Sequence, residues 1–325
     1  MAHVVVGKLD PQGPSKPHLL VCRQLQATNN STIARLVNDA MTLLWPSGIQ
    51  YEKVILLVSD AAPYMLKAGR NLGVFYPNLL HVTCLAHALH RVAEAVRASS
   101  KNVNNLVSSV RKVFVKAPTR VELYKSMNPE LKLPPEPVLT RWGTWLTAVS
   151  FHADNFKAIT SVIERLDEDS AAITKAKETA RDPQLGQELA FIKTNFGTIP
   201  KAIESLEKRD LPPQEAIQIV QTVQQDLEGS KGAVADAVKE KLSLVLQKNP
   251  GFKRMCEITK VLSGEQAKEA LDIPPDLLAA YKYAPTTSVE VEQTFSVFKH
   301  VLSDHRRKLT PENLEKMLVI QCNRR

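Results

Sequence analysis

Residues 54–65 read VILLVSDAAPYM, a stretch that combines the end of a strand with the start of a helix. The apolar run 54–58 is typical of a strand that is buried on both faces. Pro63 suits the first position of a helix, because no N–H is needed there, and this makes Ala62 the predicted N-cap. Asp60 then lies at the carboxyl end of the strand, where ligand-binding groups of open α/β sheets gather. The residues alone support a turn role and a site role for Asp60 equally.

Strands and helices alternate around this stretch. Strands are predicted over 2–9, 18–25, 54–58 and 80–83, and the turn sequence DPQGPSKP predicts that the first two form an antiparallel pair. Apolar spacing predicts helices over 30–44, from Pro63 to near Gly69, and directly after residue 83. The first hundred residues therefore predict an α/β fold.

No strand is predicted after residue 100. Apolar spacing instead predicts a helical block over 103–115, 138–165, 185–208, 214–227 and 232–248. Two further helices are predicted near the end of the chain, over 288–302 and 311–322. The predicted organisation is an α/β part, a helical block and a C-terminal helical pair.

Composition limits the class of protein. The 325-residue chain carries a formal net charge of +8, which favours a polyanionic partner such as nucleic acid. Its four cysteines are scattered, which indicates a reducing compartment rather than a disulfide framework. No apolar run approaches the ~20 residues of a membrane-spanning helix, and no secretory signal is visible. A membrane protein or a secreted disulfide-rich protein is therefore not expected.

A second acidic candidate lies at the start of the predicted helix 288–302. Thr287 and Glu290 form a T-x-x-E capping box, which gives Glu290 a structural role. Glu292 is left without one, and it lies beside the apolar stripe of Val291, Phe295, Phe298 and Leu302. It is either a solvated flank or a ligand directed into a groove. Together with Asp60 it would suit two-metal phosphoryl chemistry, in which carboxylates from several elements hold Mg²⁺ ions.

Other groups admit both a structural and a functional interpretation. Cys84, His87 and His90 cannot all face one zinc ion on a single helix, since positions 84 and 90 lie about 240° apart. A buried cysteine beside a locally bonded histidine is therefore favoured. Trp142 and Trp145 are predicted as a core pair, with base stacking as the alternative.

Two features near the C-terminus are equally open. A basic cluster is either a solvated loop or a phosphate-binding surface, and it consists of Lys299, His300, His305, Arg306, Arg307 and Lys308. The last predicted helix carries an apolar face that needs a partner, formed by Leu314, Met317, Leu318 and Ile320. An internal core or a second subunit would both serve.

Four stretches occur in the order that is typical of hAT-superfamily transposases, and the chain resembles that family on these motifs. They are VSDAAPYM at 58–65, CLAH at 84–87, TRW at 140–142 and SVEVEQTFSVFKHVLSDHRRKLTPENLEKMLVIQCN at 288–323. The last stretch resembles the hAT C-terminal dimerisation region over its whole length and is the most specific of the four.

The resemblance implies an RNase H-like fold with a mixed sheet, a mostly helical insertion and C-terminal helices. The implied parts are an incomplete RNase H-like part at 1–145, the insertion at 146–270 and the dimerisation region at 271–325. The implied chemistry is metal-dependent DNA cleavage and strand transfer by a DDE triad with Mg²⁺ or Mn²⁺. Asp60 resembles the second carboxylate of the triad and Glu292 the third, so both would be catalytic groups and metal ligands.

The resemblance also assigns neighbouring residues. Cys84 and His87 fall on the family's C-x-x-H motif near the site, and Arg141 and Trp142 fall on its R-W pair, which is associated with DNA. Further DNA contacts would come from Lys299, Arg306, Arg307 and Lys308. A homodimer formed through the C-terminal region and a nuclear location are implied as well.

The chain departs from the family pattern at its N-terminus. The first family aspartate lies on a strand upstream of the segment that VVVGKL resembles, and this strand and the N-terminal zinc finger are not found here. We therefore expect an N-terminally truncated and catalytically incomplete chain that dimerises and binds DNA, either a fragment of a larger gene or a degenerate, domesticated copy. The alternatives are an active transposase or nuclease whose first aspartate is missing only from this gene model, and a product that does not fold stably.

Overall fold

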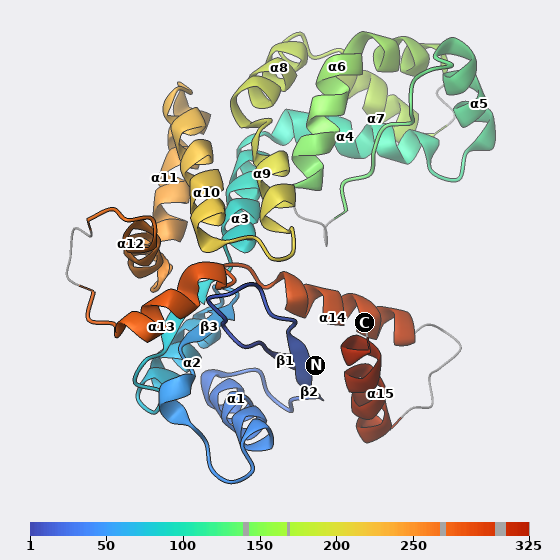
Figure 1. Cartoon of the computed structure of the whole chain (residues 1–325). Helices are drawn as coiled ribbons and strands as arrows, with labels where there is room; N and C mark the ends of the chain where they lie inside the picture. The colour runs from blue at the N-terminus through green and yellow to red at the C-terminus, as the bar shows by residue number, and fades with distance from the viewer. Residues whose placement is uncertain (139–142, 168–169, 267–270, 303–309, 325) are drawn as a thin grey trace. The chain divides into compact units, whose positions relative to one another are not determined.

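The computed structural model describes residues 1–138, 143–167, 170–266, 271–302 and 310–324 (Figure 1). The chain divides into two compact units. Unit 1 comprises residues 1–88, 206–219 and 246–325, and unit 2 comprises residues 89–205 and 220–245. Within the described residues, all strands belong to unit 1 and unit 2 is entirely helical, so the structure is mixed α/β with a helical majority.

Unit 1 contains two small sheets. Strands β1 (Ala2–Val6) and β2 (His18–Arg23) are antiparallel, with an irregularity between Val4 and Val5. Strands β3 (Leu56–Ser59) and β4 (Leu80–Thr83) are parallel. These four strands, and the antiparallel pairing of the first two, confirm the predictions from the sequence. In the described chain the two sheets do not pair with each other.

Both sheets cover a common core. This core consists of Val21, Leu36, Ala40, Met41, Leu72 and Tyr76. Helices α1 (Asn30–Leu44) and α2 (Pro63–Gly73) supply four of its members and pack against each other. Val4 and Val6 of β1 and Leu57 of β3 lie against the same cluster. The two sheets therefore lie on one apolar layer although no hydrogen-bond ladder joins them.

The outer edge of each sheet is closed by an asparagine side chain. Asn323 accepts the N–H of Leu19 at 2.9 Å and donates to the Leu19 carbonyl at 3.0 Å. Asn249 does the same for Thr83 of β4, at 2.9 and 2.8 Å. Each amide thereby satisfies a donor and an acceptor of an edge strand that would otherwise be left without a partner. The edges of β1 and β3 opposite their partners are paired with no strand of the described chain.

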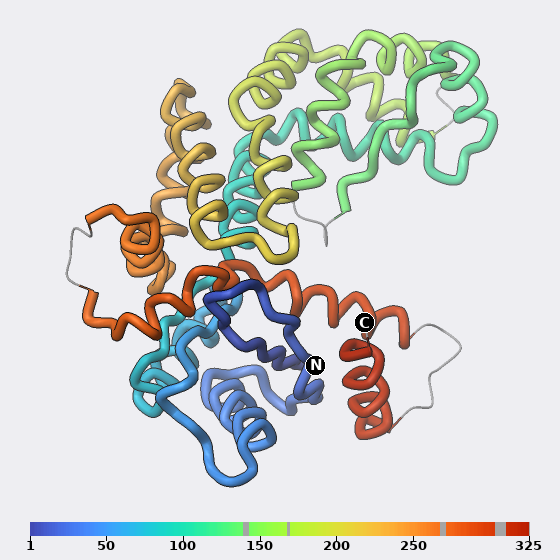
Figure 2. The backbone as a smooth tube through the Cα atoms, viewed as in Figure 1, coloured from blue at the N-terminus to red at the C-terminus, as the bar shows by residue number. Residues whose placement is uncertain are grey.

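The C-terminal helices pack on the N-terminal sheet. Helix α14 (Val289–Val301) lies over β1, where the rings of His3 and Phe295 stack with centroids 4.0 Å apart. Helix α15 (Pro311–Asn323) lies along β2, and Thr310 caps its first turn. Figure 2 shows the two ends of the chain side by side in unit 1. The remaining elements of unit 1 are η1 (Tyr51–Lys53), α12 (Phe252–Leu262), α13 (Pro275–Ala280) and η2 (Tyr281–Tyr283).

Unit 2 holds the long helical block. Helices α3 (Leu85–Ser99) and α10 (Pro213–Glu228) begin in unit 1 and run into it, and α11 (Ala233–Gln247) runs back out. Between them lie α4 (Lys101–Phe114), α5 (Pro118–Met127), α6 (Thr144–Arg165), α7 (Ala171–Ala180), α8 (Leu185–Phe196) and α9 (Ile199–Leu206). Helix α4 packs on α7, and α6 packs on α8.

Two helix predictions for this block need correction. The helix predicted over 138–165 begins only at Thr144, because Gly143 has a left-handed φ of +72° that a right-handed helix cannot include. The helix predicted over 185–208 is two helices, α8 and α9, separated at residues 197–198. Helices α5, α7, α12 and α13 were not predicted. They are short, and α5 has weak apolar spacing because only one of its residues is buried.

Candidate carboxylate site

Asp60 lies in the turn between β3 and α2. Ala62 is the N-cap of α2 and Pro63 its first residue, as the sequence predicted. The Ala62 side chain offers no capping oxygen, and the Asp60 carboxylate accepts the Ala62 N–H at 2.9 Å. Asp60 is half-buried. It therefore closes the turn with one carboxylate oxygen, while the other oxygen is available for a further interaction.

Glu292 lies in the first turn of α14, but the start of this helix differs from the prediction. The N-cap is Ser288 rather than Thr287, and no side-chain cap bond is formed. Glu290 does not complete a capping box and instead pairs with Arg209 at 3.3 Å. The start of the helix is set by a tertiary contact, in which the Ser288 N–H donates to the Cys84 sulfur at 3.3 Å. A contact with a residue about two hundred positions away thus replaces local capping.

The two carboxylates interact although they are far apart in the sequence. The Glu292 side chain is 47% exposed, and its partial burial raises its pKa above the ordinary value. Lys299 opposes this rise, and the negative charge of Asp60 adds to it. The Asp60 charge also raises the pKa of Tyr64, although burial is the larger cause there. The structure therefore brings Asp60, Glu292 and Lys299 within electrostatic range of one another.

The C-x-x-H residues lie beside Glu292. Cys84 is only 1% exposed, and burial raises the pKa of its thiol. His87 places Nδ1 3.4 Å from the Ser288 hydroxyl and Nε2 3.9 Å from the Glu292 carboxylate. Cys84 is thus a buried cysteine, and His87 contacts the first turn of the helix that carries Glu292.

Oxygen donors of this kind suit Mg²⁺ or Mn²⁺. However, no group of three or more His, Cys, Asp or Glu side chains that could hold a metal ion exists among the described residues. The pair Asp60 and Glu292 therefore falls short of the ligand set of a two-metal centre. The same finding gives no support to a zinc site at Cys84, His87 and His90.

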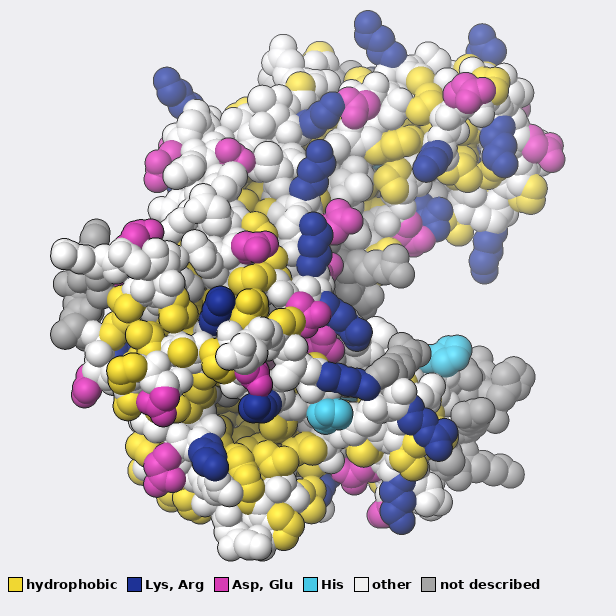
Figure 3. Space-filling view, viewed as in Figure 1, with side chains coloured by type: hydrophobic (Ala, Val, Ile, Leu, Met, Phe, Trp, Pro, Cys, Tyr) yellow, Lys and Arg dark blue, Asp and Glu magenta, His cyan; other side chains and the backbone are white. Residues whose placement is uncertain are grey.

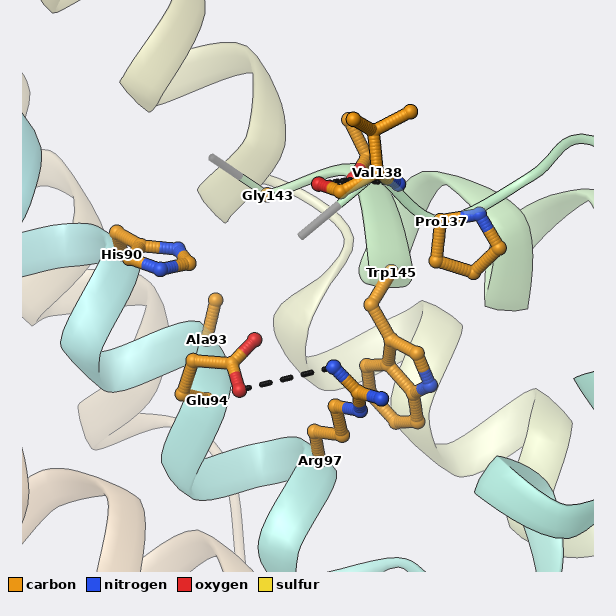
Figure 4. A pocket seen from close by; sticks show the side chains of 9 residues that line it. His90, Ala93, Glu94, Arg97, Pro137, Val138, Gly143 and Trp145 are labelled. Carbon is orange, nitrogen blue, oxygen red and sulfur yellow. Dashed lines mark hydrogen bonds and ion pairs between the residues drawn. The ribbon is translucent and has the colours of Figure 1, made fainter. Parts of the chain in front are cut away.

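Unit 2 contains a small pocket of its own (Figure 4). His90, Glu94 and Arg97 of α3 line one side, and the segment around Pro137 and Trp145 lines the other. Glu94 and Arg97 form an ion pair at 3.8 Å. Trp145 is 4% exposed and belongs to the core of unit 2. Its predicted partner Trp142 and the neighbouring Arg141 lie outside the described residues.

The basic candidates are only partly covered by the structure. Lys299 is exposed in the last turn of α14, whereas Arg306, Arg307 and Lys308 lie outside the described residues. Several Lys and Arg side chains lie over α14 and α15 on the face seen in Figure 3. The part of the basic cluster that is described is therefore on the surface and close to Glu292.

Sequence reasoning missed several residues that build this site. Arg209 pairs with Glu290, Ser288 starts α14, and Ser59 and His81 share a hydrogen bond of 2.8 Å next to Asp60. His81 had one available signal, since a histidine in an otherwise apolar strand is an unusual buried residue. The contacts of Arg209 and Ser288 join distant segments and leave no local pattern.

One part of the chain matches a known protein family. Residues 281–323 match the hAT family C-terminal dimerisation region, which covers η2, α14 and α15. No curated protein matches the chain. No helix within the described ranges is long and apolar enough to cross a membrane. The matched region contains Glu292, so one residue of the candidate site lies within it.

Proposed function

We propose that this chain is a hAT transposase-derived nuclear protein that forms a homodimer, binds DNA and is catalytically incomplete. The observation that carries the proposal is the match of residues 281–323 to the hAT C-terminal dimerisation region. The electrostatic contact between Asp60 and Glu292 supports it, because the resemblance pairs these two residues as catalytic carboxylates.

The arrangement of the sheets supports an RNase H-like origin. Strands β1 and β2 are antiparallel, β3 and β4 are parallel, and within the described chain the second edges of β1 and β3 are paired with no strand. One further strand between these edges would join the two sheets into a single mixed sheet. In the proposed fold that strand would carry the first aspartate of the triad.

With two carboxylates the site would hold a divalent ion weakly. Asp60 and Glu292 would supply oxygen ligands to Mg²⁺ or Mn²⁺, and the ion would screen the repulsion between them. Two metal ions need ligands from several carboxylates to bind an attacking and a leaving oxygen together. We therefore expect no DNA cleavage by this chain.

The proposed dimer uses the outer face of α15. Leu314 and Leu318 are buried against Leu19, Cys22 and Val301, so an internal core covers this part of the helix. Ile320 is 51% exposed and remains for a second subunit. A copy of the same region is the proposed partner, because the matched family region is a dimerisation region and homo-oligomers use the same patch on both subunits.

Light scattering with a matched pair of variants tests the dimer. The wild-type chain should have about twice the monomer mass of 36.1 kDa. Ile320→Asp should dissociate it, because a buried unpaired charge is costly at an interface. Phe75→Asp changes an exposed apolar residue outside the matched region and should leave the dimer intact. A monomeric wild type, or equal behaviour of the two variants, would contradict the proposal.

DNA binding is tested by fluorescence anisotropy with a labelled duplex at increasing salt. Affinity should fall steeply as salt rises, because Lys and Arg side chains release counterions from the phosphates. Removing the cluster with Lys299→Ala, Arg306→Ala and Arg307→Ala should weaken binding and flatten the salt dependence. Changing Lys231, Lys241 and Lys248 to Ala is the matched control. Binding that is absent at low salt would exclude a DNA role for this chain.

A further inference from the structure

One short segment contacts both elements that carry the carboxylates. Residues 81–87, HVTCLAH, leave β4 and enter α3. We call this segment the bracket. The N–H of Cys84 donates to the Ser59 carbonyl at 2.8 Å, directly before Asp60. The N–H of Leu85 donates to the Thr286 carbonyl at 3.1 Å, two residues before Ser288, the N-cap of α14. The first backbone donors of α3 are thus used to join the two distant segments.

The first arm of the bracket holds Asp60. His81 places Nε2 2.8 Å from the Ser59 hydroxyl, and this hydroxyl donates to the Asp60 carbonyl at 2.7 Å. Because the only hydroxyl proton is used in that bond, the Ser59 oxygen accepts from a proton on His81 Nε2. Both side chains are buried. The backbone of Asp60 is therefore fixed through Ser59 and His81.

The second arm holds the helix that carries Glu292. The Cys84 thiol accepts the Ser288 N–H at 3.3 Å, and His87 Nδ1 lies 3.4 Å from the Ser288 hydroxyl. Ser288 is thus held through its backbone and its side chain, one turn before Glu292. Helices without a side-chain cap leave their first N–H groups to other partners, and here the bracket supplies that partner.

Close packing leaves the bracket little freedom. A Cβ added at Gly69 of α2 would lie 2.1 Å from His81 Nδ1, and one added at Gly251 would lie 2.4 Å from the His81 carbonyl oxygen. Neither glycine position has room for any side chain. His81 is therefore enclosed from both sides, so a movement of the bracket would have to move α2 and α12 as well.

We propose that the bracket sets the position of Asp60 relative to Glu292, with His81 and Cys84 as positioning residues that act through Ser59 and Ser288. This inference rests on the proposed function, in which the two carboxylates form one site. It identifies the segment that positions Asp60 and Glu292, which lie more than two hundred residues apart in the sequence, next to each other. Two backbone hydrogen bonds from the bracket, one to Ser59 and one to Thr286, fix the distance between the turn after β3 and the start of α14.

The test measures the electrostatic effect of Asp60 on Glu292. The chemical shift of the Glu292 side-chain carboxyl carbon is measured by NMR with and without Asp60→Asn, and the difference is called the perturbation. In Cys84→Ala the perturbation should fall about twofold or more, because the interaction between charges weakens with distance. Cys84→Ser keeps an acceptor for Ser288 and should retain most of it. Ser59→Ala should weaken the perturbation through the other arm.

Ser109→Ala is the matched control, since Ser109 is a buried residue of unit 2 whose hydroxyl donates to the Leu106 carbonyl within α4. It should leave the perturbation unchanged. The proposal is overturned if Cys84→Ala keeps the full perturbation, if Ser109→Ala reduces it equally, or if Asp60→Asn has no effect in the otherwise unchanged chain. Added Mn²⁺ tests the metal site separately. If Mn²⁺ does not broaden the Glu292 signal, the metal-binding part of the proposed function is wrong, and the proposal about the bracket is unaffected.

Discussion

Gly69 decides how closely α2 approaches β4. The absence of a side chain lets His81 lie directly against the helix, and His81 in turn bonds Ser59 next to Asp60. Glycine is required at position 69 because no space is left for a side chain. Backbone conformation does not require it, since the φ of Gly69 is not in the left-handed region. The position of Asp60 therefore depends on a residue of the next helix that touches no charged group itself.

Gly69→Ala should lower the free energy of unfolding by about 1–3 kcal/mol, since overpacking displaces neighbouring side chains. Gly73→Ala is the matched control in the same helix, because a Cβ there meets nothing within 4 Å. It should be neutral or stabilising by up to about 1 kcal/mol. Urea unfolding of both variants checks this. Equal stability of the two would show that the close approach at Gly69 carries no energetic constraint.

Buried histidines predict the acid sensitivity of the chain. His152 of α6 is 1% exposed, neither ring nitrogen has a hydrogen-bond partner among the described residues, and burial lowers its pKa to about 4. The unfolded state then binds more protons than the folded state between about pH 6.5 and 4. Stability should therefore fall as the pH falls through this window.

Replacing His152 by Leu should remove up to about 3 kcal/mol of this pH-dependent loss. His18→Leu changes an exposed histidine and should leave the loss as it is. Thermal melts of the two variants between pH 7 and pH 4 make the comparison. A wild-type slope retained in His152→Leu would assign the acid sensitivity to other groups.

Residue-scale prediction from the sequence succeeded where the signal was local. Pro63 identified Ala62 as the cap because a proline restricts only its nearest neighbours. Thr287 failed as a cap because the Cys84 thiol competes for the next residue from elsewhere in the fold. Asp60 proved to have a turn bond and a charged neighbour together, so the two roles that the sequence offered are compatible.

At the scale of elements, the two sheets are held by helices rather than by each other. Asn249 and Asn323 close the outer edges of β4 and β2 with paired amide bonds. The sequence predicted the four strands because each is a short apolar run. It could not predict which amide would close which edge, since each bond joins residues more than 160 positions apart.

Asn249→Ala should cost about 2–4 kcal/mol of unfolding free energy, because it leaves a buried donor and a buried acceptor of Thr83 without partners. Asn249→Asp keeps an acceptor for the Thr83 N–H and should retain part of that stability. Asn323→Ala makes the same truncation at the less buried edge and should cost less. Chemical unfolding ranks the three variants. An Asn249→Ala cost no larger than that of Asn323→Ala would refute the ranking.

At the scale of the whole molecule, the candidate site combines the two ends of the chain. Asp60 belongs to the N-terminal α/β segment and Glu292 to the region that matches the hAT dimerisation family. The α/β beginning and the helical block followed from the sequence, because each has its own apolar period. The convergence of Asp60 and Glu292 did not, because no local pattern records which distant segments meet. The candidate site therefore depends on Asp60 and Glu292 lying close together in the folded chain.

An NMR titration of the Glu292 side chain tests whether Asp60 and Glu292 share one site. The pKa of Glu292 should lie above its ordinary value, and Asp60→Asn should lower it, because partial burial remains while the repulsive charge is removed. Asp39→Asn removes a carboxylate that pairs with Arg23 instead and should leave the Glu292 titration unchanged. A Glu292 pKa that Asp60→Asn does not move would contradict the shared site.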